Sequence, residues 1–325
     1  MRICIVGAGA IGGFLGVRLA VAGHDVSLIA RGAHLAAIRA HGVHLVMSGA
    51  TTVVSLAASD NPADLGRQDY VILTLKAPSL PSLVPRLGPL LGGETTVVTA
   101  MNGLPWWFYN GIGGPLEVEP LDAVDPDGGL AAAVDPASIV GCVVHAGASV
   151  PEPGVVRHAA GDHFIFGEPS HVVTARVRAL AAAVTDAGLR GEASDNIHRE
   201  IWLKLLGNLS MGTISVLTGA TLRNIGDDRN LRAAAAMLLD ECRAVGARFG
   251  LTLAMTNDAR IDLGAALGHF RPSILQDLEA GRPMEIDAVI TVVAELGRRA
   301  GVVTPVLDMV LALVQGRARL AGLYP

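Results

Sequence analysis

The chain is 325 residues long, carries a net charge of −5, and is 51% hydrophobic and 17% charged. This length favours two domains over one. Charges of both signs are interspersed, and the lack of a basic run argues against a nucleic-acid partner. Because no stretch contains 18 consecutive apolar residues, we expect no membrane span, and the hydrophobic fraction indicates a large buried core.

Cysteine and histidine usage argues against disulfides and metal sites. The ten histidines show no spacing typical of metal ligands. His34, His41 and His44 cluster loosely, in a pattern typical of a solvated helix and loop. The three cysteines are odd in number, widely spaced and set among apolar residues: Cys4, Cys142 and Cys242. We therefore predict buried thiols in a reducing compartment, and no metal.

The first motif joins a short apolar strand to a glycine-rich turn. Residues 2–6 are followed at once by Gly7-Ala8-Gly9-Ala10-Ile11-Gly12, and then by apolar residues at helical spacing. In this context Gly7 permits a tight turn, Gly9 lets the backbone approach a pyrophosphate, and Gly12 allows close helix–strand packing. The helix N-terminus offers unpaired N–H groups to phosphates. With a second strand at 26–29, the pattern predicts dinucleotide binding.

The same N-terminal segment has an alternative interpretation as a secretory signal, because Arg2 precedes an apolar stretch. The glycine spacing and the lack of a convincing cleavage site argue against it. We therefore expect a cytoplasmic protein.

Strands and helices alternate through the first half. Apolar runs at 71–75 and 95–99 are typical of buried strands, and a helical segment interrupted by proline lies between them. Runs at 140–150 and 155–166 resemble later strands, whereas 110–137 is rich in Gly, Pro and Asp and is expected to be an extended loop or insertion. This pattern predicts an α/β Rossmann-type domain over 1–195, with a parallel sheet covered on both faces.

From residue 196 the chain predicts an all-α domain that extends to residue 325. Glycines at 250, 281 and 301 mark helix ends, and prolines at 283 and 305 mark helix starts. The predicted helices share long apolar or amphipathic patterns and cover 197–217, 229–249, 274–280, 285–300 and 305–318. A crevice between the two domains is the expected place for a small-molecule substrate. The apolar helices are also compatible with a homodimer.

The end of the second strand indicates which dinucleotide binds. An NAD site usually has an acidic residue there, which binds the ribose 2′-hydroxyl. Here the strand ends at Arg31, and Asp25 lies at its opposite end. A guanidinium suits a 2′-phosphate, so we predict NADP, although an ordinary surface arginine would give the same pattern.

Polar residues follow two other predicted strands. Lys76 ends one strand, and Asn102-Gly103 follows the next. Each alone is compatible with a solvated turn. Because ligands bind beyond the carboxyl ends of parallel strands, we expect both side chains to contact cofactor or substrate.

The helical half adds two further elements. Lys204 and Asn208 lie one turn apart on one face of an apolar helix, although Glu200 would also permit a surface ion pair with Lys204. Ser273 with Gln276 fits a capping box, and Glu285 fits an acid that complements a helix N-terminus. From spacing alone, these structural readings of Ser273 and Glu285 are favoured.

Together these segments resemble the ketopantoate reductase (2-dehydropantoate 2-reductase) family over nearly the whole chain. The resemblance rests on five motifs in order: G-A-G-A-I-G at 7–12, L-T-L-K-A at 73–77, M-N-G at 101–103, E-I-W-x-K-L-x-x-N at 200–208, and S-I-L-Q-D-L with E-I-D between 273 and 287. It implies NADPH as cofactor and a 2-oxo acid as substrate.

The resemblance also implies a role for each matching residue. Lys204 corresponds to the general acid, and Asn208 and Ser273 correspond to substrate contacts. Asn102 and Glu285 correspond to residues at the cofactor and catalytic centre. The remaining matches concern the cofactor or a second lysine: Lys76 as an active-site lysine that also contacts the cofactor, Arg31 at the 2′-phosphate, and Gly147 where the backbone touches the cofactor.

Two departures from the family pattern bear on the substrate. A second substrate-binding Asn is usual one turn beyond Asn208, whereas this chain has Gly212. In addition, Trp106-Trp107-Phe108-Tyr109 follows the Asn-Gly turn, in a chain that is only 4% aromatic. This run is either a hydrophobic plug or subunit contact, or a lid that reshapes the pocket for a different 2-oxo acid.

Three functions remain open at this point. The first is NADPH-dependent reduction of ketopantoate to pantoate, with Lys204 donating the proton to the carbonyl oxygen. The second is reduction of another 2-oxo acid. The third, a non-catalytic NADPH-binding regulator, is disfavoured because it has no need for Lys204, Asn208 and Ser273 together.

Overall fold

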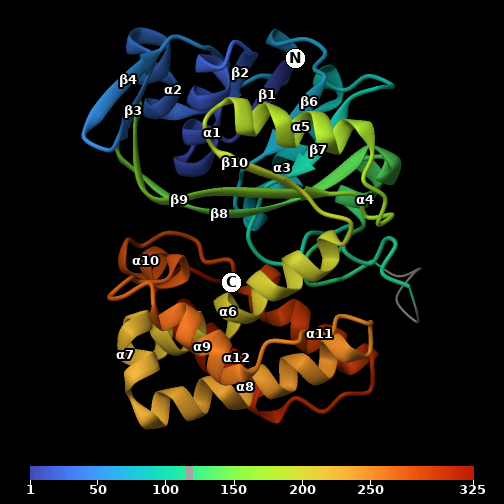
Figure 1. Ribbon diagram of the computed structural model, residues 1–325, viewed down its shortest axis with the longest axis vertical. Coiled ribbons are helices and arrows are strands. Elements are labelled where there is room, and N and C mark those ends of the chain that lie inside the picture. The colour runs from blue at the N-terminus through green and yellow to red at the C-terminus, as the bar shows by residue number, and fades with distance from the viewer. Residues whose placement is uncertain (114–119) are drawn as a thin grey trace. The chain divides into compact units, whose positions relative to one another are not determined.

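The computed structural model describes residues 1–113 and 120–325, which form two compact units (Figure 1). Unit 1 contains Met1–Met101 and Gly129–Ile197, and unit 2 contains Asn102–Gly128 and His198–Pro325. The sequence analysis assigned all of 1–195 to one domain. In the structure the chain leaves unit 1 after Met101, because the backbone N–H of Leu104 donates to the carbonyl of Ala288 in unit 2.

The segment 110–137 is not uniformly an extended loop. Its residues 114–119 lie outside the described part of the chain. Further on, it contains the short helix α4 (Gly129–Ala133) and a 3₁₀ turn at Pro136–Ser138.

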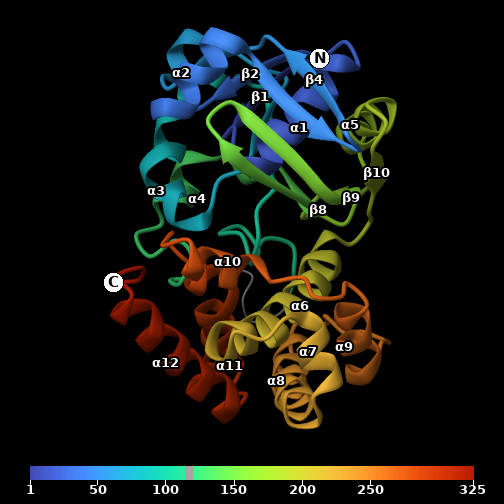
Figure 2. The same cartoon turned by 90° about the vertical axis from the view of Figure 1, so that its left-hand side faces the viewer.

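Unit 1 is built on a mixed sheet with the strand order β4-β3-β9-β8-β7-β6-β1-β2-β5, in which β10 pairs with β9 (Figure 2). The strands are β1 (Arg2–Val6), β2 (Asp25–Ile29), β3 (Val43–Met47), β4 (Ala50–Val54), β5 (Ala57–Ser59), β6 (Tyr70–Leu73), β7 (Thr96–Thr99), β8 (Ile139–Glu152), β9 (Val155–Gly167) and β10 (Arg190–Ala193). The six strands from β8 to β5 in this order run parallel, which gives the doubly wound arrangement of dinucleotide-binding domains.

The remaining strands include antiparallel pairs, which the sequence analysis did not predict. β9 runs antiparallel to β8, and β3 and β4 form a further antiparallel pair. The β8–β9 connection is a tight turn at Pro153-Gly154, in which Gly154 has φ +82°, so the chain reverses directly instead of crossing over through a helix. The β3–β4 hairpin was not predicted from the sequence.

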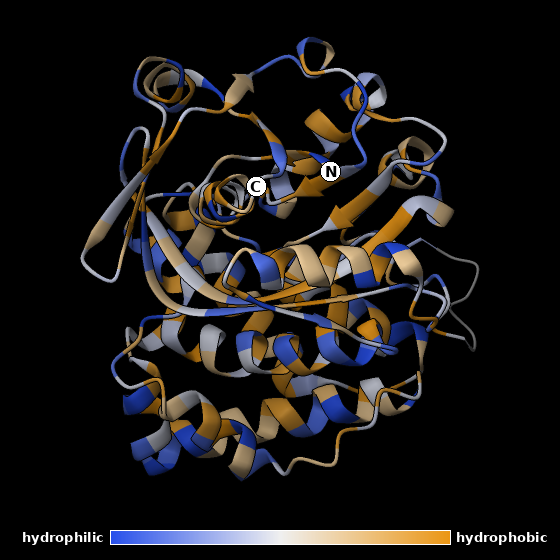
Figure 3. Cartoon of the chain, turned by 45° about the horizontal axis from the view of Figure 1, so that its top comes forward, coloured by the Kyte–Doolittle hydropathy of each residue, from blue (hydrophilic) through white to orange (hydrophobic). Residues whose placement is uncertain are grey.

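Both faces of the central strands are buried, as predicted. Ile3 and Ile5 of β1 belong to a core cluster with Phe14 and Phe164, whereas Cys4 and Val6 alternate with them and are also fully buried. Figure 3 shows strongly hydrophobic residues on these strands. The helices of unit 1 are α1 (Ala10–Val21), α2 (Gly32–His41), α3 (Leu80–Leu83), α4 and α5 (Ala175–Asp186). Among them, α1 packs against β8 and β9.

The predicted burial of the cysteines is confirmed. Cys4, Cys142 and Cys242 are all buried thiols. Burial raises the pKa of Cys4 to about 11 and raises the pKa of Cys242 further. Since the thiolate is the reactive form, these cysteines act as small core residues.

Unit 2 is helical, as predicted. Its helices are α6 (Ile197–Thr218), α7 (Leu222–Asp227), α8 (Arg229–Ala247), α9 (Asn257–Ala265), α10 (Ser273–Glu279), the π-helical turn η7 (Asp287–Thr291), α11 (Val292–Arg299) and α12 (Pro305–Leu320). Helices α7 and α9 pack against each other and were not predicted. Each begins at a threonine cap, Thr221 or Thr256, whose hydroxyl accepts a backbone N–H.

Helix α6 is the most apolar long helix among the described residues. By length and composition alone it passes as a membrane span, with a mean hydropathy of 1.2. However, 67% of that window is buried inside the fold. This burial is typical of the core helix of a helical domain.

The aromatic run after the Asn-Gly turn belongs to the core of unit 2. Trp106, Trp107 and Phe108 are at most 1% exposed. The ring of Phe108 stacks on Trp202 of α6 with centroids 6.4 Å apart, and His198 meets Phe108 edge-on at 5.0 Å. Of the two interpretations left open by the sequence, the hydrophobic plug is therefore the one that the structure supports.

Replacing Phe108 by alanine should lower the free energy of unfolding of unit 2 by about 3–5 kcal/mol, because it leaves a cavity among buried rings. Urea denaturation followed by circular dichroism measures this loss. The matched control is Phe270→Ala, since Phe270 is 42% exposed, and it should cost less than about 1 kcal/mol. Equal losses of unfolding free energy in the two variants would contradict the interpretation of the aromatic run as a hydrophobic plug.

Candidate active site

The glycine-rich loop of unit 1 has the geometry that a dinucleotide requires. Gly7 has φ +106°, and a Cβ at Gly12 would lie 2.1 Å from the carbonyl oxygen of Gly7, so neither position accepts a side chain. At Gly9, the N-terminal cap of α1, a Cβ would meet nothing within 4 Å. The open space beside Gly9 and the first-turn N–H groups of α1 fit a pyrophosphate.

Three other predicted cofactor residues also belong to unit 1. Arg31 follows β2 and is the exposed N-terminal cap of α2. Lys76 follows β6, is half-buried and precedes a 3₁₀ turn at Ala77–Ser79. Gly147 lies in β8 where the pairing register with β9 shifts, a type of irregularity that is common beside active sites. Their contacts with a cofactor remain predictions.

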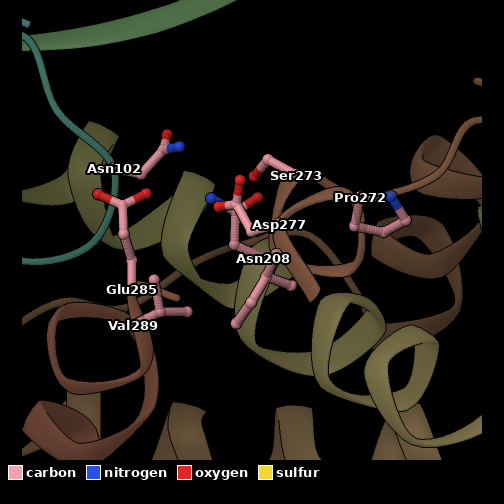
Figure 4. A pocket seen from close by; sticks show the side chains of 8 residues that line it. Asn102, Asn208, Pro272, Ser273, Asp277, Glu285 and Val289 are labelled. Carbon is pink, nitrogen blue, oxygen red and sulfur yellow. The ribbon is translucent and has the colours of Figure 1, made fainter. Parts of the chain in front are cut away.

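Unit 2 contains a small pocket that brings four of the predicted residues together. Figure 4 shows the polar ends of Asn102, Ser273 and Glu285 turned toward one space. The pocket is lined by Asn102, Asn208, Pro272, Ser273, Ile274, Asp277, Glu285 and Val289. Residues separated by nearly 190 positions in the chain thus line one small cavity.

Lys204 joins this pocket through Asn102. Its Nζ donates a hydrogen bond of 2.7 Å to Oδ1 of Asn102, in a partly buried setting. The ion-pair alternative placed Glu200 with Lys204, whereas Glu200 pairs with Arg199 at 3.3 Å. The ammonium of α6 is therefore directed toward the Asn-Gly turn.

The Asn-Gly turn is fastened to unit 2 by close backbone contacts. Gly103 has φ +79°, and a Cβ there would lie 2.3 Å from the carbonyl oxygen of Ala288. The next residue, Leu104, donates its N–H to the same oxygen at 2.8 Å. Only glycine permits this close approach. The turn is therefore fixed in position, and so is Asn102, which precedes Gly103.

The π-helical turn η7 and the residues before it form a wall of the pocket beside the Asn-Gly turn. Glu285, 8% exposed, precedes this turn, and Val289 lies within it. The Asp287 carboxylate in the same turn accepts hydrogen bonds from Thr291 at 2.8 Å and from the hydroxyl of Tyr324 at 2.7 Å. Burial, followed by the bond to Asp287, raises the pKa of Tyr324 to about 12. π-Helical turns of this kind often occur at functional sites.

Helix α10 corrects the capping-box interpretation. Pro272 is the N-terminal cap, Ser273 is the first helical residue, and the Gln276 amide donates to the Arg271 carbonyl instead of completing a box. The Ser273 side chain lines the pocket. Glu285 likewise lines the pocket instead of merely facing a helix N-terminus.

The sequence analysis missed Asp277 as a site residue. Its side chain is 6% exposed, lines the pocket, and accepts a 3.0 Å hydrogen bond from Nε of Arg282. Helical spacing could have indicated it, since Asp277 lies four residues after Ser273 and therefore on the same face of α10. Arg282 compensates the charge that this carboxylate brings into the pocket.

Gly212 lies where α10 approaches α6. A Cβ at Gly212 would lie 3.3 Å from Cγ2 of Ile274 and 4.0 Å from Pro272, two residues of the pocket wall. The space beside Gly212 is therefore bounded by hydrocarbon.

Within residues 1–113 and 120–325, no group of three or more His, Cys, Asp or Glu side chains could hold a metal ion. The polar groups of the pocket are thus amide, hydroxyl, ammonium and carboxylate.

Comparison with known proteins gives two family matches that together span most of the chain. Residues 3–106 match the family described as ketopantoate reductase PanE/ApbA, and residues 196–318 match its C-terminal domain. The chain is 46% identical over its whole length to a 2-dehydropantoate 2-reductase of Mesorhizobium japonicum, and covers 100% of that protein.

Solved structures agree with this result. A crystal structure from Ralstonia solanacearum, assigned as a ketopantoate reductase, superposes with a TM-score of 0.95 at 45% identity and covers 99% of both chains. D-Mandelate dehydrogenase, solved with NADH and anilino(oxo)acetate, shares the fold with a TM-score of 0.86 at 23% identity, over 99% of this chain and 100% of its own. The chain therefore belongs to the ketopantoate reductase family and is an oxidoreductase.

Proposed function

We propose that the protein reduces 2-dehydropantoate to pantoate with NADPH, a step of pantothenate biosynthesis. The observation that carries this proposal is the partly buried Lys204–Asn102 hydrogen bond beside a pocket of carboxylate, amide and hydroxyl groups. The full-length relative from Mesorhizobium japonicum bears the name of this activity. We further propose that the enzyme acts in the cytoplasm on this small molecule, alone or as a homodimer.

Lys204 is proposed as the general acid. When a ketone is reduced, negative charge develops on its oxygen, and a positioned acid must protonate that oxygen. Of 25 basic residues in the sequence only two are lysines, Lys76 and Lys204. An arginine cannot lose its proton near neutral pH, whereas an ammonium can. A lysine at position 204, unlike an arginine, can therefore donate the proton that the reaction requires.

The remaining pocket residues bind and orient the substrate. Asn102 accepts a hydrogen bond from Nζ of Lys204 and so directs the ammonium toward the pocket. Ser273 is proposed to donate to the substrate carboxylate, and Asn208 to contact a substrate hydroxyl. Glu285 is proposed to hold the ammonium or the cofactor ribose, with Lys76 as the second lysine of the centre.

The glycine-rich loop is proposed to bind the cofactor, together with Arg31 at the 2′-phosphate and Gly147 at the backbone. Ketopantoate reductases use NADPH, and the open N-terminus of α1 beside Gly9 fits its pyrophosphate. When bound, NADPH supplies the hydride.

The apolar side chains beside Gly212 favour a second candidate substrate, a 2-oxo acid other than ketopantoate. Ile274 and Pro272 offer no hydrogen bond at that end of the pocket. A 2-oxo acid with an apolar side chain would give up no hydrogen bond when it binds there. A substrate hydroxyl buried against this wall would lose its hydrogen bonds to water without gaining one from the protein.

A panel of 2-oxo acids tests the substrate. Oxidation of NADPH, followed by absorbance, should saturate with ketopantoate at a higher kcat/KM than with acids that have branched aliphatic or aromatic side chains. A better apolar acid would favour the second candidate. Silence with every acid, together with measurable NADPH binding, would indicate a regulator and refute the reductase.

Replacing Lys204 by alanine should lower kcat by about 10²–10⁴-fold, which is the usual contribution of a positioned acid. Lys204→Arg is the matched control for charge, because it keeps a cation beside Asn102 but cannot donate a proton, and it should lose as much activity. The Kd for NADPH should change little in both variants. Near-normal turnover of either variant would remove Lys204 from the acid role.

Replacing Arg31 by alanine should raise the KM for NADPH by about 10–100-fold, since a charge-assisted hydrogen bond to phosphate is lost. The KM for NADH should stay the same, because NADH lacks the 2′-phosphate. Steady-state kinetics with both cofactors measure the difference. A parallel rise for both cofactors would contradict the assignment of Arg31.

A further inference from the structure

His34 connects three segments of unit 1. It lies in the first turn of α2, three residues after Arg31, and is half-buried. Its Nε2 is 2.6 Å from the carbonyl oxygen of Ala8 in the glycine-rich loop. Its Nδ1 accepts a 3.0 Å hydrogen bond from the backbone N–H of Gly154, in the β8–β9 turn. The sequence analysis had placed His34 on a solvated helix, and this arrangement corrects it.

These two contacts define the state of the ring. The N–H of Gly154 can only donate, so Nδ1 must be the unprotonated nitrogen. A neutral imidazole with a bare Nδ1 carries its hydrogen on Nε2, and this hydrogen points at the Ala8 carbonyl. His34 therefore donates to the glycine-rich loop.

The bond to Ala8 determines the direction of the next amide. No cis peptide bond occurs among the described residues, so the C=O of Ala8 and the N–H of Gly9 lie in one plane and point in opposite directions. Because the carbonyl is turned toward His34, the Gly9 N–H is turned away from it. Gly9 caps α1 at the point where the surrounding space is open.

The rest of the loop is fastened by other elements. The N–H groups of Gly7 and Ala8 both donate to the carbonyl of Ile29, at 3.0 and 3.1 Å. The Gly7 carbonyl accepts a 2.7 Å bond from the Thr74 hydroxyl. His34 is thus the side chain that holds the Ala8–Gly9 peptide, the plane nearest the open N-terminus of α1.

We propose that His34 is a positioning residue that aims the Gly9 amide at the pyrophosphate of the dinucleotide. This inference rests on the proposed cofactor site. In this proposal the start of α2 contributes to the binding of two cofactor groups. Arg31 binds the 2′-phosphate, and His34 fixes the loop that binds the pyrophosphate. Neither role requires His34 to touch the cofactor.

The effect of His34 should be independent of the 2′-phosphate. The pyrophosphate is common to NADPH and NADH, so loss of the His34 bond should raise the Kd of both by the same factor, about three- to tenfold for one hydrogen bond. Arg31→Ala, in contrast, should weaken NADPH alone. Equal loss on both cofactors therefore separates loop positioning from recognition of the 2′-phosphate.

Two conservative variants distinguish the hydrogen bond from packing. His34→Gln can place an amide N–H where Nε2 lies, so it should retain the bond to Ala8. His34→Asn places its amide near Nδ1, where it can still meet Gly154 but is too short for Ala8. The matched control is His41→Ala, since His41 lies in the last turn of the same helix and is exposed.

The experiment is isothermal titration of the full-length, ligand-free protein with NADPH and with NADH, together with thermal unfolding of each variant without ligand. We expect His34→Asn to raise both Kd values about three- to tenfold, and His34→Gln and His41→Ala to bind like the unmodified protein. The KM for NADPH of His34→Asn should rise while its kcat at saturation stays the same.

Two results would overturn the proposal: unchanged Kd values in His34→Asn, or equal weakening in His34→Asn and His34→Gln at similar melting temperatures. Loss that is confined to NADPH would instead assign His34 to the 2′-phosphate and would also refute it. Failure of the unmodified protein to bind either cofactor would refute the cofactor site itself, which is a separate outcome.

Discussion

Leu104 donates its backbone N–H to the carbonyl of Ala288, and the position of Asn102 in the candidate active site depends on this contact. It fastens the Asn-Gly turn to the π-helical segment that also carries Glu285 and Val289. Asn102 then accepts a 2.7 Å hydrogen bond from the partly buried ammonium of Lys204. The proposed acid Lys204, its amide partner Asn102 and the segment that follows Glu285 are thereby connected by one backbone turn, which only glycine at 103 allows.

The glycine-rich loop of unit 1 is held in a comparable way. Its amides at 7 and 8 are bound by Ile29, and its carbonyls at 7 and 8 by Thr74 and His34. The groups that a phosphate needs remain at the start of α1. A loop fixed before binding loses little conformational entropy when the ligand arrives, which is how preorganisation increases affinity. In both units, hydrogen bonds to backbone carbonyls hold the flexible glycine segments in place.

Much of this arrangement was predictable from the sequence, because it follows from local patterns. The glycine spacing, the parallel strands of unit 1 and the long helices of unit 2 all follow from periodicity and turn residues. The transfer of Asn102 to unit 2 was not predictable, since it depends on a contact with Ala288 far along the chain. The position of Ser273 in the pocket and the partners of His34 also depend on contacts between distant parts of the chain. The sequence therefore indicated only a helix cap for Ser273 and gave no partner for His34. Asp277 was accessible from helical spacing and was overlooked.

The scarcity of lysine has a chemical consequence. Amine-directed reagents such as acid anhydrides or aldehydes find only Lys76, Lys204 and the terminal amino group in this chain, since the other 23 basic side chains are guanidinium groups. Nonenzymatic acylation or glycation, which in most proteins is spread over a lysine-rich surface, would here fall on the two positions assigned to the reaction. With both lysines in their proposed roles, very few such modification events would inactivate the enzyme.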